Sequence, residues 1–121
     1  MAELWEHAGA AYAWIRRSDR ARRGDQARPH AERLESMRAD RHLRLLKVSE
    51  ELGEATQAAI GVEGQNPRKG VTHSNSDVAT ELCDVILSTM VAMHDYTHDP
   101  EAFMDEYFEA RSDRIKEWSG E

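Results

Sequence analysis

Four carboxylates arranged as two pairs are the residues in this sequence best suited to do chemistry. Glu51 and Glu54 are three residues apart in KVSEELGEATQAAIG, and Glu81 and Asp84 are three apart in VATELCDVILSTMVAM. Residues at this spacing lie on the same face of a helix. The segment around Glu81 is apolar nearly all the way round, which predicts a largely buried helix. Because burying a carboxylate without a partner costs several kcal/mol, we expect this pair to hold a ligand.

The two pairs meet if the helices that carry them pack antiparallel. Glu51 and Glu54 border an apolar stripe formed by Leu45, Val48, Leu52 and Ala55. Both pairs would then project into one cleft and form a site of hard oxygen ligands. Such ligands suit Mg²⁺ or Mn²⁺, whereas structural zinc favours Cys and His. We therefore predict a metal site at Glu51, Glu54, Glu81 and Asp84. Taken alone, the Glu51 pair has a solvated helix face as its alternative explanation.

Hydrophobic periodicity and turn residues predict four helices and no strand, which makes the chain a single all-α domain over residues 1–121. Ser74 with Asp77 resembles a capping box, and Asp99 before Pro100 marks the start of the last helix. We expect a four-helix bundle, with a basic connection near residues 16–30 and a loop of about a dozen residues after the second helix. The predicted helices cover about 2–22, 30–62, 76–96 and 100–118.

The apolar side chains of each predicted helix are expected to face the core of the bundle. In the last helix these are Phe103, Tyr107, Phe108, Ile115 and Trp118. A chain of this length buries only about two-thirds of its unfolded surface, so homodimerisation would complete the core. Cys83 is the only cysteine, which excludes an internal disulfide, and we expect its thiol to be buried and unreactive.

The composition argues against membrane-spanning and exported classes. Apolar residues make up 40% of the sequence, yet no stretch approaches the roughly 20 apolar residues that cross a bilayer. The N-terminal segment MAELWEHAGAAYAW lacks the basic start and apolar core of a secretory signal. We therefore expect a cytoplasmic protein without a membrane partner.

Charge is divided unevenly along the chain. Residues 1–47 carry eleven Lys and Arg against seven acidic residues, a net of +4, and residues 48–121 carry five against sixteen, a net of −11. An acidic protein that handled polyphosphates would need cations to bring the charges together. A basic cluster makes nucleic acid an alternative partner. A solvated linker, or pairing with the acidic part of another subunit, explains that cluster more simply. Its members are Arg16, Arg17, Arg20, Arg22, Arg23 and Arg28.

The two carboxylate pairs also carry a family resemblance. SEELGEA followed by TELCD resembles the Glu-Glu-x-x-Glu and Glu-x-x-Asp signature of the MazG-like all-α nucleoside triphosphate pyrophosphohydrolases. The resemblance covers about residues 43–95, and the loop GQNPRKGVTHS is similar to that of small bacterial members. Such proteins are similar to dimeric dUTPases and dCTP pyrophosphatases in fold and metal use. The resemblance implies a Mg²⁺-dependent enzyme that converts a nucleoside triphosphate to monophosphate and pyrophosphate in nucleotide-pool housekeeping. It also implies a homodimer or a dimer of dimers.

The resemblance implies roles for individual carboxylates. Glu51, Glu54, Glu81 and Asp84 would bind Mg²⁺, with Mn²⁺ as the other candidate. Glu50 would sit at the edge, either as a further ligand or orienting water. Glu50 and Glu54 are the candidates to accept the proton of the attacking water.

Four cationic residues are candidates for holding the substrate phosphates. Lys47 lies one turn before Glu51, where a simple Lys–Glu helix pair is the alternative. Arg68 and Lys69 lie in the long loop, where they either close over a triphosphate or remain solvated. Many relatives use a Lys and an Asn in the last helix. Neither aligns clearly with EARSDRIKEW, so Arg111, or else Arg114, is the candidate there.

This departure in the last helix favours a second functional reading. A MazG-like chain without those phosphate-binding residues would be a catalytically weak metal- or nucleotide-binding sensor or adaptor. Turnover of a triphosphate separates the two hypotheses, because a sensor binds its ligand without releasing pyrophosphate.

Overall fold

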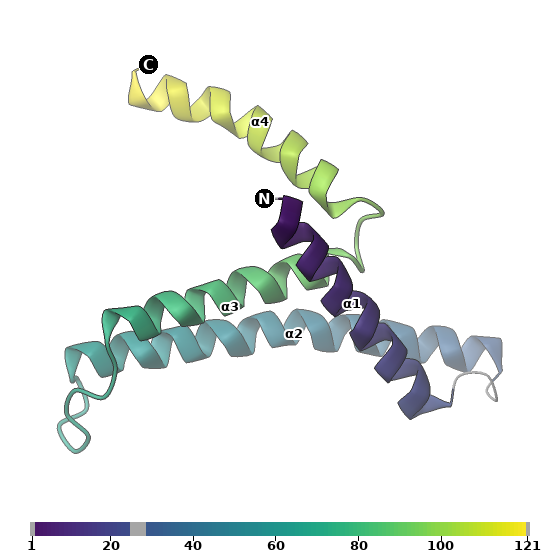
Figure 1. The fold of residues 1–121 in the computed structure, drawn as a ribbon, viewed down its shortest axis with the longest axis horizontal. Helices are drawn as coiled ribbons and strands as arrows, with labels where there is room; N and C mark the ends of the chain where they lie inside the picture. Colours follow the sequence, from purple (N-terminus) through teal and green to yellow (C-terminus); the bar gives the residue numbers. More distant parts are fainter. Residues whose placement is uncertain (1, 25–28, 121) are drawn as a thin grey trace.

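A computed structural model of the chain describes residues 2–24 and 29–120, which form four α-helices and no strand (Figure 1). The all-α class and the four helices predicted from the sequence are confirmed. No helix in these described ranges combines the length and the apolar character needed to cross a membrane. The helices are α1 (Ala2–Arg23), α2 (His30–Glu63), α3 (Asn75–Met93) and α4 (Pro100–Ser119).

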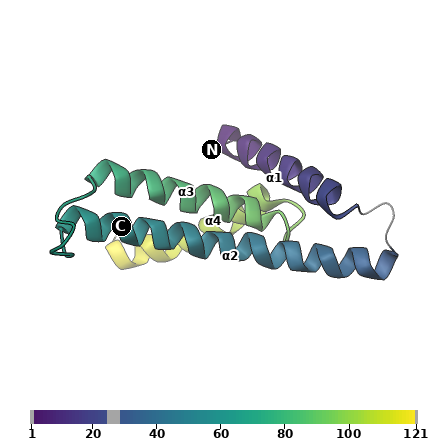
Figure 2. The ribbon, with the colours of Figure 1, turned by 90° about the horizontal axis from the view of Figure 1, so that it is seen from below.

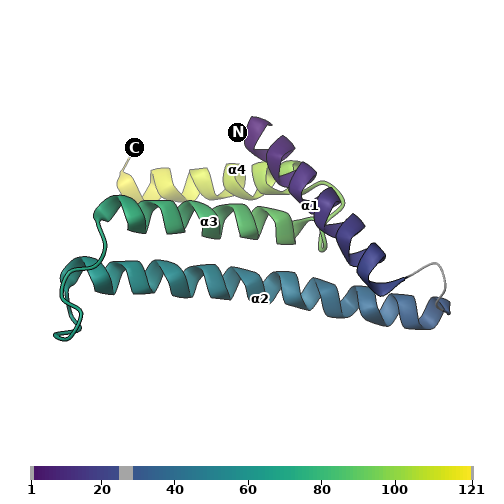
Figure 3. The same cartoon turned by 60° about the horizontal axis from the view of Figure 1, so that its bottom comes forward.

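An antiparallel pair of helices, α2 and α3, is the framework of the molecule (Figure 3). α2 is one continuous helix even through its polar first part, and Gly64 ends it in the left-handed conformation at φ 64°. The chain then returns close to α2, where the Thr72 N–H donates to the Gly61 carbonyl at 3.0 Å. A Cβ on Gly61 would lie 2.2 Å from His73 Nδ1. A side chain at position 61 would therefore displace the Thr72 and His73 side chains where the connection crosses α2.

The predicted helix caps are present. The Ser74 side chain accepts a hydrogen bond from the Asp77 N–H, and the Asp77 side chain accepts one from the Ser74 N–H. Hydrogen bonding of the Asp77 carboxylate to the Ser74 backbone N–H, and then to the Ser74 side chain, makes the pKa of Asp77 lower than usual. Asp99 caps α4, with Pro100 in its first turn. α3 ends at Met93, three residues before the predicted end at Tyr96, because residues 94–96 form a turn in which amides bond to carbonyls three residues back.

α1 crosses the far end of the α2–α3 pair obliquely (Figures 1 and 2). Its apolar side chains form its packing face, as expected of each helix, since Trp5 and Ala8 are buried against Met90 and Val91 of α3. Arginines of the predicted basic connection also belong to α1, because the helix continues to Arg23. The part of that connection at residues 25–28 lies outside the described residues.

A buried ion network fastens the same end of the molecule, and it was not predicted from the sequence. Arg44 of α2 donates to Asp19 of α1 at 2.8 Å and to Asp95, just after α3, at 2.8 Å. Tyr12 also donates to Asp95 at 2.8 Å. Burial opposes ionisation of Asp95, but the hydrogen bonds from Arg44 and Tyr12 outweigh it and make its pKa lower than usual.

Only the start of α4 packs against the other helices. Pro100 is buried and Met104 packs against the α1–α3 core, but the rest of the helix makes only sparse contacts and extends away (Figure 1). The expectation that its apolar residues face a core within the chain is wrong. No helix in the described part of the chain covers these side chains. Those that are exposed are Phe103, Tyr107, Phe108, Ile115 and Trp118.

Other apolar positions are also more open than the sequence predicts. α3 was expected to be largely buried, yet Leu82 and Ile86 are exposed, as are Leu45 and Leu52 of α2. The cause is that α3 packs mainly against α2 and α1, so part of its circumference is open. Cys83 lies on this open stretch, and its thiol is exposed rather than buried as expected.

Candidate metal centre

The α2–α3 pair brings together three of the four predicted metal ligands. Glu51 of α2 and Glu81 and Asp84 of α3 each offer a carboxylate oxygen, and these oxygens all lie within 4.8 Å of one another. The arrangement follows from antiparallel packing, because residues three apart on α3 face the same stretch of α2. Three converging carboxylates repel one another unless a cation or protons neutralise them.

The cluster is partly withdrawn from solvent. The side chain of Glu51 is only 13% exposed, and Glu81 is also half-buried between the helices. Oε2 of Glu81 is buried and has no hydrogen-bond partner among the described residues. A buried carboxylate oxygen without a partner is unfavourable. A bound cation would satisfy this oxygen.

Glu54, the fourth predicted ligand, lies at the solvent-exposed edge and does not belong to the close set of three. It is still near enough to interact with that set. The negative charge of Glu51, desolvation and the charge of Glu81 raise the pKa of Glu54 above its usual value. Gly53 beside it has open space, since a Cβ there would meet nothing within 4 Å. A ligand could therefore approach the backbone at this point.

Lys47 and Glu50 lie beside Glu51, at another edge of the carboxylate cluster. Lys47 Nζ lies 3.1 Å from Glu50 Oε2 and 3.3 Å from Glu51 Oε1. These two hydrogen bonds raise the pKa of Lys47. The sequence left open whether Lys47 forms a helix ion pair or contacts phosphate, and the ion pair is present. Lys47 therefore already places a positive charge beside the carboxylates.

The remaining candidate phosphate-binding residues lie away from the three carboxylates. Lys69 lines a small pocket of about 200 Å³ with Gly61, Thr72 and His73. Gly61 is ten residues after Glu51, roughly 15 Å along the helix axis. Arg68 is in the same connection, where its backbone N–H donates to the Asn66 side chain at 3.1 Å. Both loop cations thus lie near one end of the α2–α3 pair.

Arg111 lies on α4, with its guanidinium carbon 4.9 Å from the centre of the Tyr107 ring. α4 makes only sparse contacts with the other helices, so Arg111 is not part of the carboxylate cluster in a single chain.

The comparisons with known proteins add no relative to this geometry. No family model, curated protein or solved structure matches the chain.

Proposed function

We propose that this chain is a Mg²⁺-dependent nucleoside triphosphate pyrophosphohydrolase of the MazG-like class. The observation that carries the proposal is the convergence of Glu51, Glu81 and Asp84, whose oxygens lie within 4.8 Å of one another. The buried, unpartnered oxygen of Glu81 supports it further. The same positions form the Glu-Glu-x-x-Glu and Glu-x-x-Asp pattern in the sequence.

The donor set fits a hard divalent cation. Carboxylate oxygens are the ligands that Mg²⁺ and Mn²⁺ prefer, and neither His nor Cys belongs to the cluster. Three carboxylates leave coordination positions for water and for substrate phosphates. Mg²⁺ sites in enzymes that act on nucleotides commonly use few protein ligands in this way.

When bound, Mg²⁺ would neutralise charge on the phosphates and lower the pKa of a bound water. Glu51, Glu81 and Asp84 would hold it, and Glu54 would accept a proton from the attacking water. The raised pKa of Glu54 suits a group that takes up a proton. The water oxygen forms a new bond to phosphorus, the bond between the α and β phosphates breaks, and pyrophosphate leaves. Glu50 is the second candidate for the proton acceptor, or it orients the water.

The cations would bind the rest of the triphosphate. Lys47 is next to the carboxylates, and Arg68 and Lys69 are in the connection at the end of the α2–α3 pair. Arg111 would require α4 to lie against the site. We further propose a homodimer or a dimer of dimers acting in the cytoplasm, where the enzyme would serve nucleotide-pool housekeeping.

The direct experiment measures pyrophosphate release from a panel of standard and non-standard nucleoside triphosphates with Mg²⁺. We expect turnover of at least one substrate. Asp84→Asn and Glu81→Gln should each lower kcat/KM at least about 100-fold, because each removes a ligand charge at the reacting phosphates. Glu109→Gln is the matched control, since this acid lies on α4, far along the chain from the cluster.

The panel also separates the enzyme from its rival. Nucleotide binding without release of pyrophosphate from any substrate would reject the enzyme and favour a sensor or adaptor. Full activity in Asp84→Asn would show that hydrolysis occurs at a different site.

A further inference from the structure

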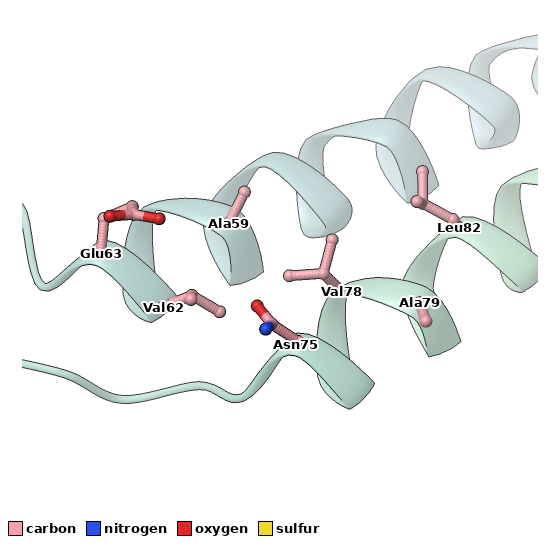
Figure 4. Close-up of a pocket in the computed structure, with 7 residues that line it drawn as sticks. All are labelled: Ala59, Val62, Glu63, Asn75, Val78, Ala79 and Leu82. Carbon is pink, nitrogen blue, oxygen red and sulfur yellow. The ribbon is translucent and has the colours of Figure 1, made fainter.

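An uncovered apolar groove runs along one side of the α2–α3 pair. At one end it has a volume of about 380 Å³, and Val62 and Val78 point toward each other across it (Figure 4). We call this surface the hairpin groove. Its lining residues are Ala59, Val62, Glu63, Asn75, Val78, Ala79 and Leu82.

The hairpin groove continues along both helices beyond this end. Leu45 and Leu52 precede Ala59 at intervals of seven residues, and Ile86 follows Leu82 by four, so all lie on the same side. All four of these leucine and isoleucine side chains are exposed. From Leu45 to Ala59 the groove is about 21 Å long.

A second uncovered surface lies on α4. At 100° per residue, its apolar residues fall within an arc of about 140°. We call this the α4 face, and it consists of Phe103, Met104, Tyr107, Phe108, Ile115 and Trp118. From Met104 to Trp118 it is also about 21 Å long. Arg111 and Arg114 fall inside the same arc, whereas the acidic residues of α4 fall outside it.

The molecule as a whole exposes more surface than a folded monomer of its mass. The accessible area is 9040 Å² for a chain of 13.8 kDa. A typical monomer of this mass exposes about 6,600 Å². The excess of roughly 2,400 Å² per chain is comparable with the area that subunits of obligate homodimers bury. Exposed apolar side chains of the hairpin groove and the α4 face contribute to this excess.

We propose that, in the homodimer proposed above, the α4 face of each copy fills the hairpin groove of the other. The two surfaces match in length and in apolar character. They also match in charge, because Glu63 lines the hairpin groove and residues 48–63 and 75–93 contain no Lys or Arg. Arg111 and Arg114 of the α4 face would therefore meet an acidic partner.

The position of α4 explains why its own groove is not its partner. Pro100 is buried and Met104 packs against the core that Trp5 and Ala8 of α1 form with Met90 and Val91 of α3. From this core α4 extends away from the α2–α3 pair (Figure 1).

Reciprocal exchange closes the assembly. Each copy gives one α4 face and receives one, so two contacts related by a twofold axis use every surface and leave none for further growth. Asp84 lies two residues after Leu82 and so points to the other side of α3, which means that this assembly does not bring Arg111 to the carboxylate cluster. The proposal rests on the homodimer proposed above and specifies its interface, and its test does not depend on hydrolase activity.

The test is the mass of the full chain in solution, measured by sedimentation velocity over a range of concentrations. We expect a dimer for the natural sequence. Leu82→Glu in the hairpin groove and Phe108→Glu on the α4 face should each raise the dimer dissociation constant at least about 100-fold, because each buries an unpaired charge. Circular dichroism checks that each variant keeps its helices.

Leu43→Glu is the matched control. Leu43 is on α2 and is 58% exposed, close to the 53% of Leu52, but it lies nine residues earlier and hence on the opposite side of the helix. This variant should remain a dimer. Dissociation of Leu43→Glu to the same extent as Leu82→Glu would overturn the assignment of the groove.

A mixing experiment tests the exchange itself. The Leu82→Glu chain keeps its α4 face and the Phe108→Glu chain keeps its groove, so one contact is restored when the two are combined. Native mass spectrometry should show a mixed dimer at concentrations where each variant alone is a monomer. A monomeric natural chain, a dimer that survives both substitutions, or a mixture without mixed dimer would each overturn the proposal.

Discussion

Glu54 has a different position from the three carboxylates that converge between α2 and α3. It lies at the exposed edge, where repulsion by Glu51, desolvation and repulsion by Glu81 raise its pKa. A carboxyl whose pKa is raised by folding favours the folded state only at low pH. That contribution is lost as the pH rises through the raised value. Without metal, ionised Glu54 therefore opposes folding at neutral pH.

Removing this charge should stabilise the metal-free protein. We expect Glu54→Gln to raise Tm in chelator at about pH 7, and to have almost no effect near pH 4, where carboxyls take up protons. Excess Mg²⁺ should shrink the gain, because the cation then neutralises the repulsion. Thermal unfolding at the two pH values measures the effect, with Glu109→Gln as the control. An equal gain at both pH values would mean that the charge of Glu54 is not the cause.

The sequence predicts which residues form the site, but it does not predict how the two helices place each of them. Glu81 and Asp84 were recognisable because an apolar helix carried two carboxylates on one face. Spacing alone predicted that Glu51 and Glu54 would contribute equally. The structure puts Glu51 between the helices and Glu54 at the edge, a difference that depends on how α2 is rotated against α3. Local sequence does not determine that rotation.

At the scale of the helices, Arg44 connects three elements through one buried guanidinium. Its side chain is 10% exposed and binds Asp19 of α1 and Asp95 at the end of α3. Arg22 also binds Asp19, at 3.2 Å, and Asp40, at 3.4 Å, but its own side chain is 65% exposed. The two arginines therefore compare a buried guanidinium with a largely exposed one.

Substitution of the two arginines should have unequal effects. Arg44→Met leaves Asp19 and Asp95 without their buried cationic partner and should lower the free energy of unfolding by about 3–5 kcal/mol. Arg22→Met should lower it less, because the Arg22 guanidinium is largely solvated and Arg44 remains as the partner of Asp19. Urea unfolding measures both. A loss for Arg44→Met as small as that for Arg22→Met would show that this network does not hold α1 in place.

The helices themselves were largely predictable, and their packing was not. Capping residues such as Ser74 and Asp99 act within a few positions of the chain, so their effect can be read locally. The Arg44 network joins residues that are 25 and 51 positions apart, and nothing in a single window indicates such a pairing. The position of α4 was mispredicted for the same reason.

At the scale of the whole molecule, the α2–α3 pair has two unlike sides. On one side, Asp84 of the carboxylate cluster and the neighbouring Glu54 reach solvent. On the other side, Leu82 and Ile86 line the hairpin groove. The pattern of apolar residues predicts that a face is buried, but it does not say by which chain. Phe108 and Trp118 were therefore assigned to a core within the chain, although they lie uncovered. A dimer formed through these surfaces would bury the apolar side chains that the sequence pattern predicts to be buried.

The measurement that tests the central claim most directly is Mn²⁺ binding, followed by the loss of the electron paramagnetic resonance signal of the free ion. The natural chain should bind Mn²⁺, excess Mg²⁺ should compete, and Glu81→Gln should abolish high-affinity binding because it removes the buried ligand oxygen. Glu109→Gln should bind as the natural chain does. Absence of binding by the natural chain, or undiminished binding by Glu81→Gln, would contradict a metal site formed by Glu51, Glu81 and Asp84.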